Sequence, residues 1–481
     1  MLLPNNLHSQ KANTKLNNEF KAVILSGYGQ KLFPLVEATP KPLLPVGNEP
    51  VISYALKWCE DSAVNGPYSV FFTLKTNSYP SDILVLSPSS FSNYLSPFLR
   101  SFNSENLPNS TKSKQEDLHI RYETVDDDDC ASWETADWLR HFKDEIKTDF
   151  VVLPCDILPP KSLPLSKVLE SYRRSKSNTL ITSLHYENSI DYGSREGPSR
   201  CITIYDQESQ TLIMPANDAN DALDLRSRLL WEYPNLTLST KLLDAHVYVV
   251  RRNVLDLLTA RPEIASIRED LLPWLSKWSY QKALYDKWGK ALKIQSDPFE
   301  DALAHSTMQI LENAPDRKPK HTGDYASADN AHSDVPPNQR IRVQTLIHKS
   351  GDGFIARANT LGGYAEMNRE ILRSHRPVPQ AGKPTVAPGS LVSQPVKIGE
   401  KSLIKMSIIG RNVEIGKGCK IIGCIIADNV VVKDGAKLDN CVVCARAKVG
   451  ERASLTLCDI GGDSDIIADT QAKNEKISLE E

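Results

Sequence analysis

Four consecutive 17-residue segments repeat one pattern of side chains: VKIGEKSLIKMSIIGRN (396–412), VEIGKGCKIIGCIIADN (413–429), VVVKDGAKLDNCVVCAR (430–446) and AKVGERASLTLCDIGGD (447–463). Three columns of the alignment hold only aliphatic residues, at steps of 6, 5 and 6: Ile398, Ile415, Val432 and Val449; Ile404, Ile421, Leu438 and Leu455; Ile409, Ile426, Val443 and Ile460. Neither an α-helix nor a hairpin strand has this period. A triangular coil does, because each of its three flat sides contributes one inward aliphatic residue.

The repeat therefore predicts a left-handed parallel β-helix of the hexapeptide type over residues 396–463. Like residues of successive coils would stack about 4.8 Å apart in a continuous aliphatic core. We expect the Pro- and Gly-rich residues 376–395 to form a linker and the charged residues 464–481 to form a flexible tail. A four-coil solenoid leaves ends and edges that usually need a cap or a partner, so we expect assembly with other proteins.

The cysteines of this repeat predict a ladder of thiols. Cys424, Cys441 and Cys458 lie one coil apart, which places them along one edge. A straight ladder does not offer the tetrahedral geometry that zinc requires, although Cys441 and Cys444 have zinc-like spacing. We favour a packed or oxidisable ladder. The chain has nine cysteines, an odd number, and its N-terminus lacks the apolar core of a signal peptide, which together favour reduced thiols and a cytosolic location.

Residues 20–375 have a different pattern, in which strand-like apolar runs alternate with helical stretches. The strand-like runs lie at 22–27, 68–74, 119–125, 150–156 and 178–186. Helices are expected from Pro50 onward and over residues 132–146, with a capping box at Ser266–Glu269. This alternation predicts a Rossmann-like α/β domain with a mostly parallel sheet. We expect residues 1–19 to be a flexible arm and residues 87–117 and 313–340 to be flexible loops.

Composition limits the classes of partner. Lys and Arg number 57 against 60 Asp and Glu, so the net charge of -3 gives no long-range attraction to nucleic acid or to an anionic membrane surface. No apolar run approaches the length of a membrane span. We therefore expect no direct nucleic-acid contact and no membrane contact.

The stretch with the strongest chemical character is AVILSGYGQKLFPLVEATPKPLLPVGNEP (22–50), a strand that runs into a glycine-containing loop. Gly27 and Gly29 would let backbone N–H groups approach phosphates, and Lys31 and Lys41 would neutralise their charge. A single Gly-x-Gly is weak support for phosphate binding. The full phrase that ends in TPKPLLPV (39–46) is a much more specific signal.

This phrase resembles the signature of nucleotide-sugar pyrophosphorylases, which join a nucleoside triphosphate to a sugar phosphate with a magnesium ion. The resemblance implies that Asp156, at the end of FVVLPCD (150–156), takes the place of a metal-binding aspartate. It also implies that the segment from Glu134 to Asp137 lies near the nucleotide base.

Several departures from the pyrophosphorylase pattern argue against turnover. The glycine loop is one residue shorter than usual, and Lys31 stands where the family has an arginine, which would grip phosphate through two bonds. Glu134 replaces a glycine and would repel a triphosphate. We therefore interpret Gly27, Gly29, Lys31 and Lys41 as a remnant phosphate loop and Asp156 as a remnant metal ligand. We expect no catalytic residue, no bound metal and no required cofactor, with at most weak nucleotide binding.

Longer phrases narrow the family. TADWLRHFKDEIKTDFVVLPCDILP, LLDAHVYVVRRNVLDLL, SIREDLLPWL and RANTLGGYAEMNREIL resemble the gamma type of the two pyrophosphorylase-like subunits of the guanine-nucleotide exchange factor for translation initiation factor 2. The resemblance implies a non-catalytic subunit of a decameric assembly, which pairs with a catalytic epsilon-type subunit through both domains and docks initiation factor 2. A GDP-mannose-type pyrophosphorylase and a nucleotide-sensing regulatory subunit remain alternatives.

Two other groups of polar residues have simpler interpretations. The acidic run from Asp126 to Asp129 is expected to be a solvated loop, because consecutive residues of a strand point to opposite faces and cannot share one metal. His246 lies in a strand-like run, and we interpret it as a hydrogen-bonded core histidine instead of a catalytic base.

Overall fold

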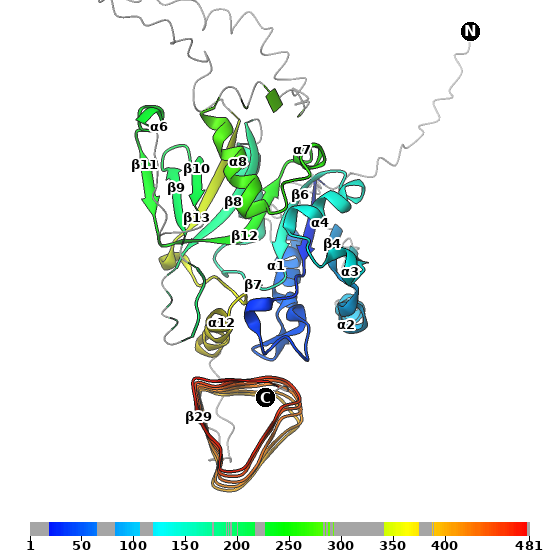
Figure 1. Ribbon diagram of the computed structural model, residues 1–481, viewed down its shortest axis with the longest axis vertical. Helices are drawn as coiled ribbons and strands as arrows, with labels where there is room; N and C mark the ends of the chain where they lie inside the picture. Colours follow the sequence, from blue (N-terminus) through cyan, green and yellow to red (C-terminus); the bar gives the residue numbers. More distant parts are fainter. Residues whose placement is uncertain are drawn as a thin grey trace, which may run out of the picture.

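The computed structural model describes residues 19–64, 82–105, 119–175, 178–188, 190, 192, 195–199, 201–216, 227–281, 284, 287, 288, 292, 341–374, 387 and 389–478. These residues form an α/β domain and a three-sided β-helix that lies against it (Figure 1). The expected strand at 68–74, the arm at 1–18 and the loop at 313–340 lie outside the described residues.

The α/β domain is built on a seven-stranded sheet. Its order is β13 (Arg342–His348), β8 (Thr179–Glu187), β12 (Leu242–Val250), β6 (Asp149–Pro154), β1 (Phe20–Leu25), β4 (Asp82–Pro88) and β5 (His119–Val125). All neighbouring pairs are parallel except those of β12, which runs antiparallel to β6 and β8. The predicted mostly parallel sheet is confirmed. Its central strands are continuous apolar runs because both faces are covered.

Helices cover the two faces of this sheet. One face packs against α1 (Ile52–Val64), α2 (Ser92–Glu105) and α5 (Leu165–Arg174). The other face packs against α4 (Thr135–His141), α7 (Val254–Ala260) and α8 (Leu272–Ser276). The described residues also include the helices α3 (Asp127–Cys130), α6 (Ser227–Glu232) and α12 (Leu361–Ser374). Single-turn helices lie at Gln30–Leu32, Lys41–Leu43, Ser89–Phe91, Lys143–Glu145, Ile267–Leu271, Lys277–Ser279 and Ser350–Asp352.

Three smaller sheets complete the domain. A three-stranded sheet has the order β10 (Leu212–Ala216), β9 (Ile202–Asp206) and β11 (Leu236–Ser239). Two antiparallel pairs join β7 (Ile157–Leu158) to β14 (Ala356–Arg357) and β2 (Pro45–Val46) to β3 (Glu49–Pro50). The β7–β14 pair brings Arg357 beside the end of β6.

Local structure differs from the sequence predictions at three places in this domain. Residues 87–105, part of the expected flexible loop at 87–117, instead end β4 and form α2. Their buried residues Phe91, Leu95 and Leu99 are separated by polar residues, which concealed the helical spacing of the apolar side chains. The helix expected over 132–146 is shorter and ends at His141 before a single turn. Pro50 ends β3, and α1 begins two residues later.

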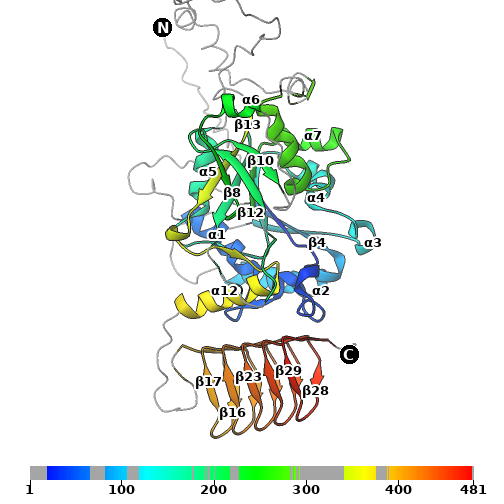
Figure 2. The ribbon, with the colours of Figure 1, turned by 60° about the vertical axis from the view of Figure 1, so that its left-hand side comes forward.

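The β-helix has three parallel sheets, one on each side of a triangle (Figure 1), and its coils are stacked in a row (Figure 2). The first holds β15 (Leu391–Val392), β18 (Ile408–Ile409), β21 (Ile425–Ile426), β24 (Val442–Val443), β27 (Asp459–Ile460) and β30 (Lys476–Ile477). The second holds β16 (Val396–Ile398), β19 (Val413–Ile415), β22 (Val431–Val432), β25 (Lys448–Val449) and β28 (Asp465–Ile466). The third holds β17 (Leu403–Lys405), β20 (Lys420–Ile422), β23 (Lys437–Asp439), β26 (Ser454–Thr456) and β29 (Gln471–Lys473).

The β-helix is longer than the predicted range of 396–463. Residues 464–478 form a further coil instead of a flexible tail, because Ile466, Ala472 and Ile477 continue the three inward columns at the same interval of 17 residues. The alanine and the surrounding charged residues concealed this coil in the sequence. At the other end, Val392 pairs with Ile409, so the last part of the expected linker already belongs to the β-helix.

The thiol ladder lies inside the β-helix. Cys424, Cys441 and Cys458 are fully buried, and the backbone N–H of Cys441 donates to the sulfur of Cys424 at 3.4 Å. Ser407 occupies the preceding step and accepts from the N–H of Cys424 at 3.1 Å. The column therefore serves to satisfy backbone donors at one corner. The nine cysteines are all free thiols.

The two domains share a hydrophobic cluster and a buried ion pair. Ile425, Val442 and Cys444 of the β-helix pack with apolar residues of the segment 32–51 and of α12. Beside this cluster, the Nη2 atom of Arg195 lies 2.9 Å from Oδ1 of Asp459 and donates to the carbonyl of Asn440 at 2.7 Å. Both charged side chains are almost completely buried. The β-helix is thus fixed directly beneath α12 and the glycine loop (Figures 1 and 2).

Candidate functional site: a closed remnant of a phosphate loop

The glycine loop follows β1 and folds back over Lys41. The N–H of Ser26 donates to the carbonyl of Leu86, which continues the sheet past the end of β1. Gly29 has a φ of 77°, and a Cβ atom there would lie 2.9 Å from Cδ of Lys41. Glycine is therefore required by both the backbone conformation and the lysine beneath it. By contrast, a Cβ atom on Gly27 would meet no atom within 4 Å.

Lys41 and Asp156 meet at the base of this loop together with Arg357. The Nζ atom of Lys41 lies 2.7 Å from Oδ2 of Asp156. The Nε and Nη2 atoms of Arg357 donate to Oδ1 and Oδ2 of Asp156 at 3.1 and 3.3 Å. Asp156 is fully buried, and the side chains of Lys41 and Arg357 are each 10% exposed. Both carboxylate oxygens are therefore engaged by cations of this chain.

The electrostatics of this triad favour the ionised carboxylate. Burial alone would raise the pKa of Asp156, but Arg357 and Lys41 outweigh it and hold the pKa well below its ordinary value. The triad carries two positive charges against one negative charge. A divalent cation placed at Asp156 would be repelled by both neighbours and would have to displace one of them.

The remaining donors also do not fit a metal. Within the part of the chain that the structure describes, no three His, Cys, Asp or Glu side chains gather as a metal site needs. A magnesium ion prefers a shell of oxygen ligands, and this pocket offers one carboxylate that two basic groups already occupy. The arrangement seen at Asp156 is thus a closed ion cluster.

The cavity beside the triad is small. Its volume is about 60 Å³, and it is lined by Lys31, Tyr186, Pro198, Ser199, Leu243, Asp244, His246, Arg268, Arg357, Asn359 and Thr360. Ligand pockets for molecules of drug or nucleotide size span roughly 300–1,000 Å³. Lys31 is exposed at the rim and does not join the triad. A larger hollow of about 900 Å³ lies among α5, β13 and the three-stranded sheet, and none of the five predicted site residues lines it.

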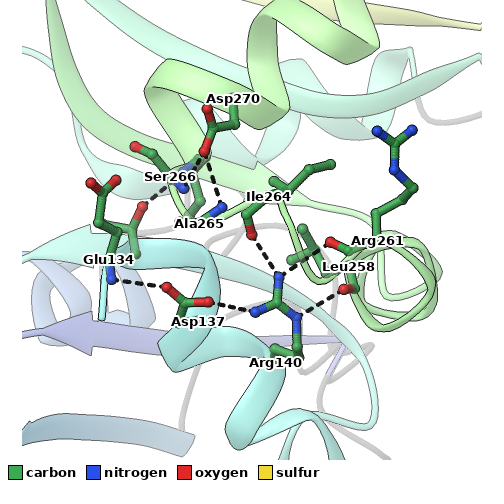
Figure 3. Close-up of polar contacts among 11 residues, drawn as sticks. Glu134, Asp137, Arg140, Leu258, Arg261, Ile264, Ala265, Ser266 and Asp270 are labelled. Carbon is green, nitrogen blue, oxygen red and sulfur yellow. Dashed lines mark hydrogen bonds and ion pairs between the residues drawn. The ribbon is translucent and has the colours of Figure 1, made fainter. Parts of the chain in front are cut away.

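The N-terminus of α4, where the resemblance places a nucleotide base, is occupied by another segment of the chain. The N–H of Ala136 donates to the carbonyl of Ala265 at 2.7 Å. The hydroxyl of Thr135 accepts from the N–H of Ile267 at 2.8 Å. Glu134 precedes the helix as predicted, and its N–H donates to the carboxylate of Asp137 (Figure 3).

Arg140 holds that covering segment in place. Figure 3 shows its guanidinium between Asp137 and the backbone of the segment 258–264. It donates to the carbonyls of Leu258 at 2.9 Å and of Ile264 at 2.6 Å. The hydroxyl of Ser266 accepts from the backbone N–H of Glu269, which is one half of the predicted capping box. The other half is made by Asp270 in place of Glu269, because the carboxylate of Asp270 accepts from the N–H groups of Ala265 and Ser266. The segment is therefore fixed by hydrogen bonds on both of its sides.

The acidic run 126–129 does not form a loop: Asp126 precedes the short helix α3, and the other three aspartates lie in its first turn. Their side chains therefore point in different directions around the helix axis. The carboxylate of Asp127 accepts from the hydroxyl of Tyr28 at 2.6 Å and from Ser90. The hydrogen bond from Tyr28 lowers the pKa of Asp127, and the bonds from Ser90 and Ser89 add to this effect. Asp127 thus anchors the glycine loop from the side.

His246 lies in β12 at a register irregularity and has a φ of 54°. The backbone N–H of His246 donates to the carboxylate of Asp244 at 2.7 Å, and His246 lines the small cavity. Burial, together with the positive charge of Arg357, lowers the pKa of His246 to about 3. The histidine is therefore neutral at physiological pH.

Arg357 is the functional residue that the sequence interpretation missed. It lies 201 positions after Asp156 and joins it only through the pairing of β14 with β7. A signal existed in the phrase FIARANT (354–360), where an arginine stands inside an apolar and small-residue run. A buried arginine requires an acidic partner. The sequence did not indicate which acid that partner would be.

Comparison with known proteins gives a separate match for each of the two domains. A family model described as nucleotidyl transferase matches residues 21–196, and one described as the EIF2B subunit epsilon LbH domain matches residues 370–470. The fold is therefore that of a nucleotidyltransferase domain joined to a left-handed β-helix.

Full-length relatives specify the family. The chain is 30% identical over 394 residues to translation initiation factor eIF2B subunit gamma of Schizosaccharomyces pombe, covering 80% of this chain and 72% of the relative. The protein of the same name from Dictyostelium discoideum is 22% identical, with 74% of this chain and 75% of the relative covered. That from Caenorhabditis elegans is 27% identical over 33% of this chain and 39% of the relative. The chain belongs to the family of eIF2B gamma subunits. No helix among the described residues is long and apolar enough to cross a membrane.

Proposed function

We propose that this chain is a non-catalytic subunit of the guanine-nucleotide exchange factor that recycles translation initiation factor 2 from its GDP-bound to its GTP-bound form. The family supports membership of the exchange factor. The observation that carries the non-catalytic role is the closed triad of Lys41, Asp156 and Arg357. A nucleotidyltransferase needs a free carboxylate for its metal, and here that carboxylate binds two side chains of the chain itself.

The segment after the glycine loop, residues 32–38, supports the β-helix. A Cβ atom on Gly462 would lie 2.4 Å from Cβ of Ala38, and one on Gly461 would lie 2.8 Å from the carboxylate of Glu37. Leu32 and Leu35 belong to the cluster that includes Ile425 and Val442. The segment that directly follows the glycines of the loop is thus packed against the second domain. This use favours a scaffold in which both domains present one rigid surface to an epsilon-type catalytic subunit.

Exchange by such an assembly requires only differential binding. The complex accelerates GDP release if it binds the nucleotide-free GTPase more tightly than the GDP-bound form. A subunit can contribute to that preference through contacts with the partner subunit or with initiation factor 2, without an acid, base or nucleophile. The subunit itself needs no cofactor and no nucleotide.

The test is reconstitution with an epsilon-type subunit and measurement of GDP release from initiation factor 2. We expect Asp156→Asn and Lys41→Met, which keep side-chain size, to leave GDP release by the assembled complex unchanged. Size-exclusion chromatography of each complex controls for assembly. Loss of GDP release from an intact complex would contradict a non-catalytic role.

A second measurement addresses the enzyme alternative. The isolated chain is incubated with a nucleoside triphosphate, a sugar 1-phosphate and magnesium, and pyrophosphate release is followed. We expect no release, and no magnesium-dependent binding of labelled GTP or ATP. Pyrophosphate release that Asp156→Asn abolishes would establish a pyrophosphorylase in place of a scaffold.

A further inference from the structure

One outer face of the β-helix carries lysines that form no ion pair with the residues that the structure describes. The third sheet (β17, β20, β23, β26 and β29) forms a side of the triangle that does not face the α/β domain (Figure 1). Lys405, Lys420 and Lys437 project from its first three strands and are exposed. Leu403 and Ile422 lie between them. We call these five residues the lysine face. On the same side of the sheet, Asp439 is the register partner of Ile422 and contributes one carboxylate, and Lys473 of β29 contributes a further lysine.

The positions of two of these lysines are electrostatically unfavourable. Lys420 and Lys437 are direct register partners in adjacent strands, and like charges opposite each other are destabilising. Among the described residues, none of the three lysines forms an ion pair. Other positions of the same β-helix pair opposite charges across one coil. Those pairs are Lys397–Glu414 at 2.6 Å, Arg446–Asp463 at 2.6 Å and Arg452–Asp469 at 2.7 Å.

Apolar side chains accompany this charge. Leu403 is 42% exposed and pairs in register with Lys420, while Ile422 pairs with Lys405. At the neighbouring corner, Met406 is 50% exposed. The face therefore combines positive charge with aliphatic surface, which matches a partner that carries carboxylates and apolar side chains together.

The composition of the face favours a protein over a nucleic acid. The five strands of this sheet contain no arginine and no aromatic residue, which are the side chains that stack on bases or grip phosphate through two bonds. The chain as a whole has a net charge of -3, so it has no general attraction to a polyanion. Charge is concentrated locally on a flat, rigid surface.

We propose that the lysine face is a docking surface for an acidic protein segment with interspersed aliphatic residues. The carboxylates of the segment neutralise the stacked lysines, and its aliphatic side chains cover Leu403 and Ile422. The surface is independent of the triad at Asp156 and of the proposed role in nucleotide exchange.

The test uses the full chain and a short fluorescein-labelled peptide that repeats Glu-Glu-Leu. Fluorescence anisotropy is recorded at low and at physiological ionic strength, with a Gln-Gln-Leu peptide and an oligouridylate of equal charge as competitors. We expect the acidic peptide to bind and Lys420→Gln/Lys437→Gln to weaken binding about tenfold. The matched control is Lys433→Gln/Lys448→Gln, which removes the same charge from positions outside this sheet and should leave binding unchanged.

Thermal unfolding of the same variants provides an independent readout. Removal of the stacked charges should leave the melting temperature of Lys420→Gln/Lys437→Gln unchanged or higher, because the repulsion is relieved. A lower melting temperature would identify the lysines as structural and overturn the proposal. Absence of peptide binding, equal loss in the control variant, or tighter lysine-dependent binding of the oligouridylate would overturn it as well. So would lysine-dependent self-association in sedimentation, which would make a second copy of the chain the occupant.

Discussion

Two buried aspartates, Asp156 in the α/β domain and Asp459 in the β-helix, are each paired with a buried arginine from a distant part of the chain. Asp156 ends a central strand and is held by two cations, Lys41 and Arg357. Asp459 lies on the outer face of a sheet, and among the described residues its carboxylate is paired with Arg195, which also donates to a backbone carbonyl.

The difference separates two uses of buried charge. At Asp156 both cations come from within the same domain, so the cluster engages both carboxylate oxygens at the end of β6. At Asp459 the arginine crosses from one domain to the other, so the pair fixes the position of the β-helix. Buried ion pairs often add little net stability, but removal of one partner is costly because the other stays charged and buried. Single substitutions therefore reveal which of the two clusters is more tightly enclosed.

Arg357→Ala should have the largest effect. It leaves Asp156 fully buried with one cation and opens a cavity at the end of β6, which we expect to cost about 3–5 kcal/mol of unfolding free energy. Urea unfolding followed by circular dichroism measures this loss. The triple variant Lys41→Met/Asp156→Asn/Arg357→Met should recover most of it, since no unpaired charge of the triad remains. No recovery would show that packing of the arginine, and not its charge, stabilises this site.

Arg195→Ala should have a smaller effect on stability. Asp459 lies at the contact between the domains, so local separation can admit water to the carboxylate, and we expect a loss of about 2 kcal/mol. Limited proteolysis and the cooperativity of unfolding check this expectation. The domains of the variant should unfold in separate steps. A single sharp transition at unchanged urea concentration would mean that the apolar cluster alone joins the domains.

Acid titration tests the contribution of the Asp156 carboxylate to stability. The pKa of Asp156 is lowered in the folded chain, so its contribution to stability is fully present above the ordinary pKa near 3.8 and is lost as pH falls further. Each unit by which the pKa is lowered is worth about 1.4 kcal/mol. Asp156→Asn should therefore flatten the dependence of unfolding free energy on pH between about pH 5 and 2. An unchanged slope would show that other carboxylates, such as Asp127, dominate acid unfolding.

The sequence predicted the two domains unequally well. The β-helix could be predicted because each coil repeats the same three inward positions. The coil at 464–478 was not predicted because Ala472 stands at one of these positions and weakens the aliphatic pattern. The nucleotidyltransferase domain could be predicted from its strands and from the phrase at residues 22–50. Asp156 and Lys41 were identified by resemblance, and the structure places them in contact.

Arg357 and Arg195 could not be assigned to their partners from the sequence. A long-range ion pair leaves no periodic pattern, and both arginines reach their partners through loops and short strands whose geometry depends on the whole fold. The covering of α4 by residues 264–267 is hidden for the same reason, because the covering segment makes these contacts through its backbone groups, which any sequence supplies. A repeat can be recognised in the sequence itself, whereas the closure of a site depends on contacts that form only in the folded chain.

The smallest expected effect concerns a solvent-exposed ion pair. It tests whether exposure to solvent, and not only charge pairing, determines how much an ion pair contributes to the free energy of unfolding. Arg446 and Asp463 form a two-bond ion pair across one coil, and both side chains are about half exposed. Water and salt screen such a pair, so Arg446→Ala should cost less than about 0.5 kcal/mol. Urea unfolding at low and high salt measures this difference against Arg195→Ala. A loss as large as that of Arg195→Ala would mean that the β-helix depends on its charged corners as much as on its aliphatic core, and the contrast between enclosed and exposed pairs would fail.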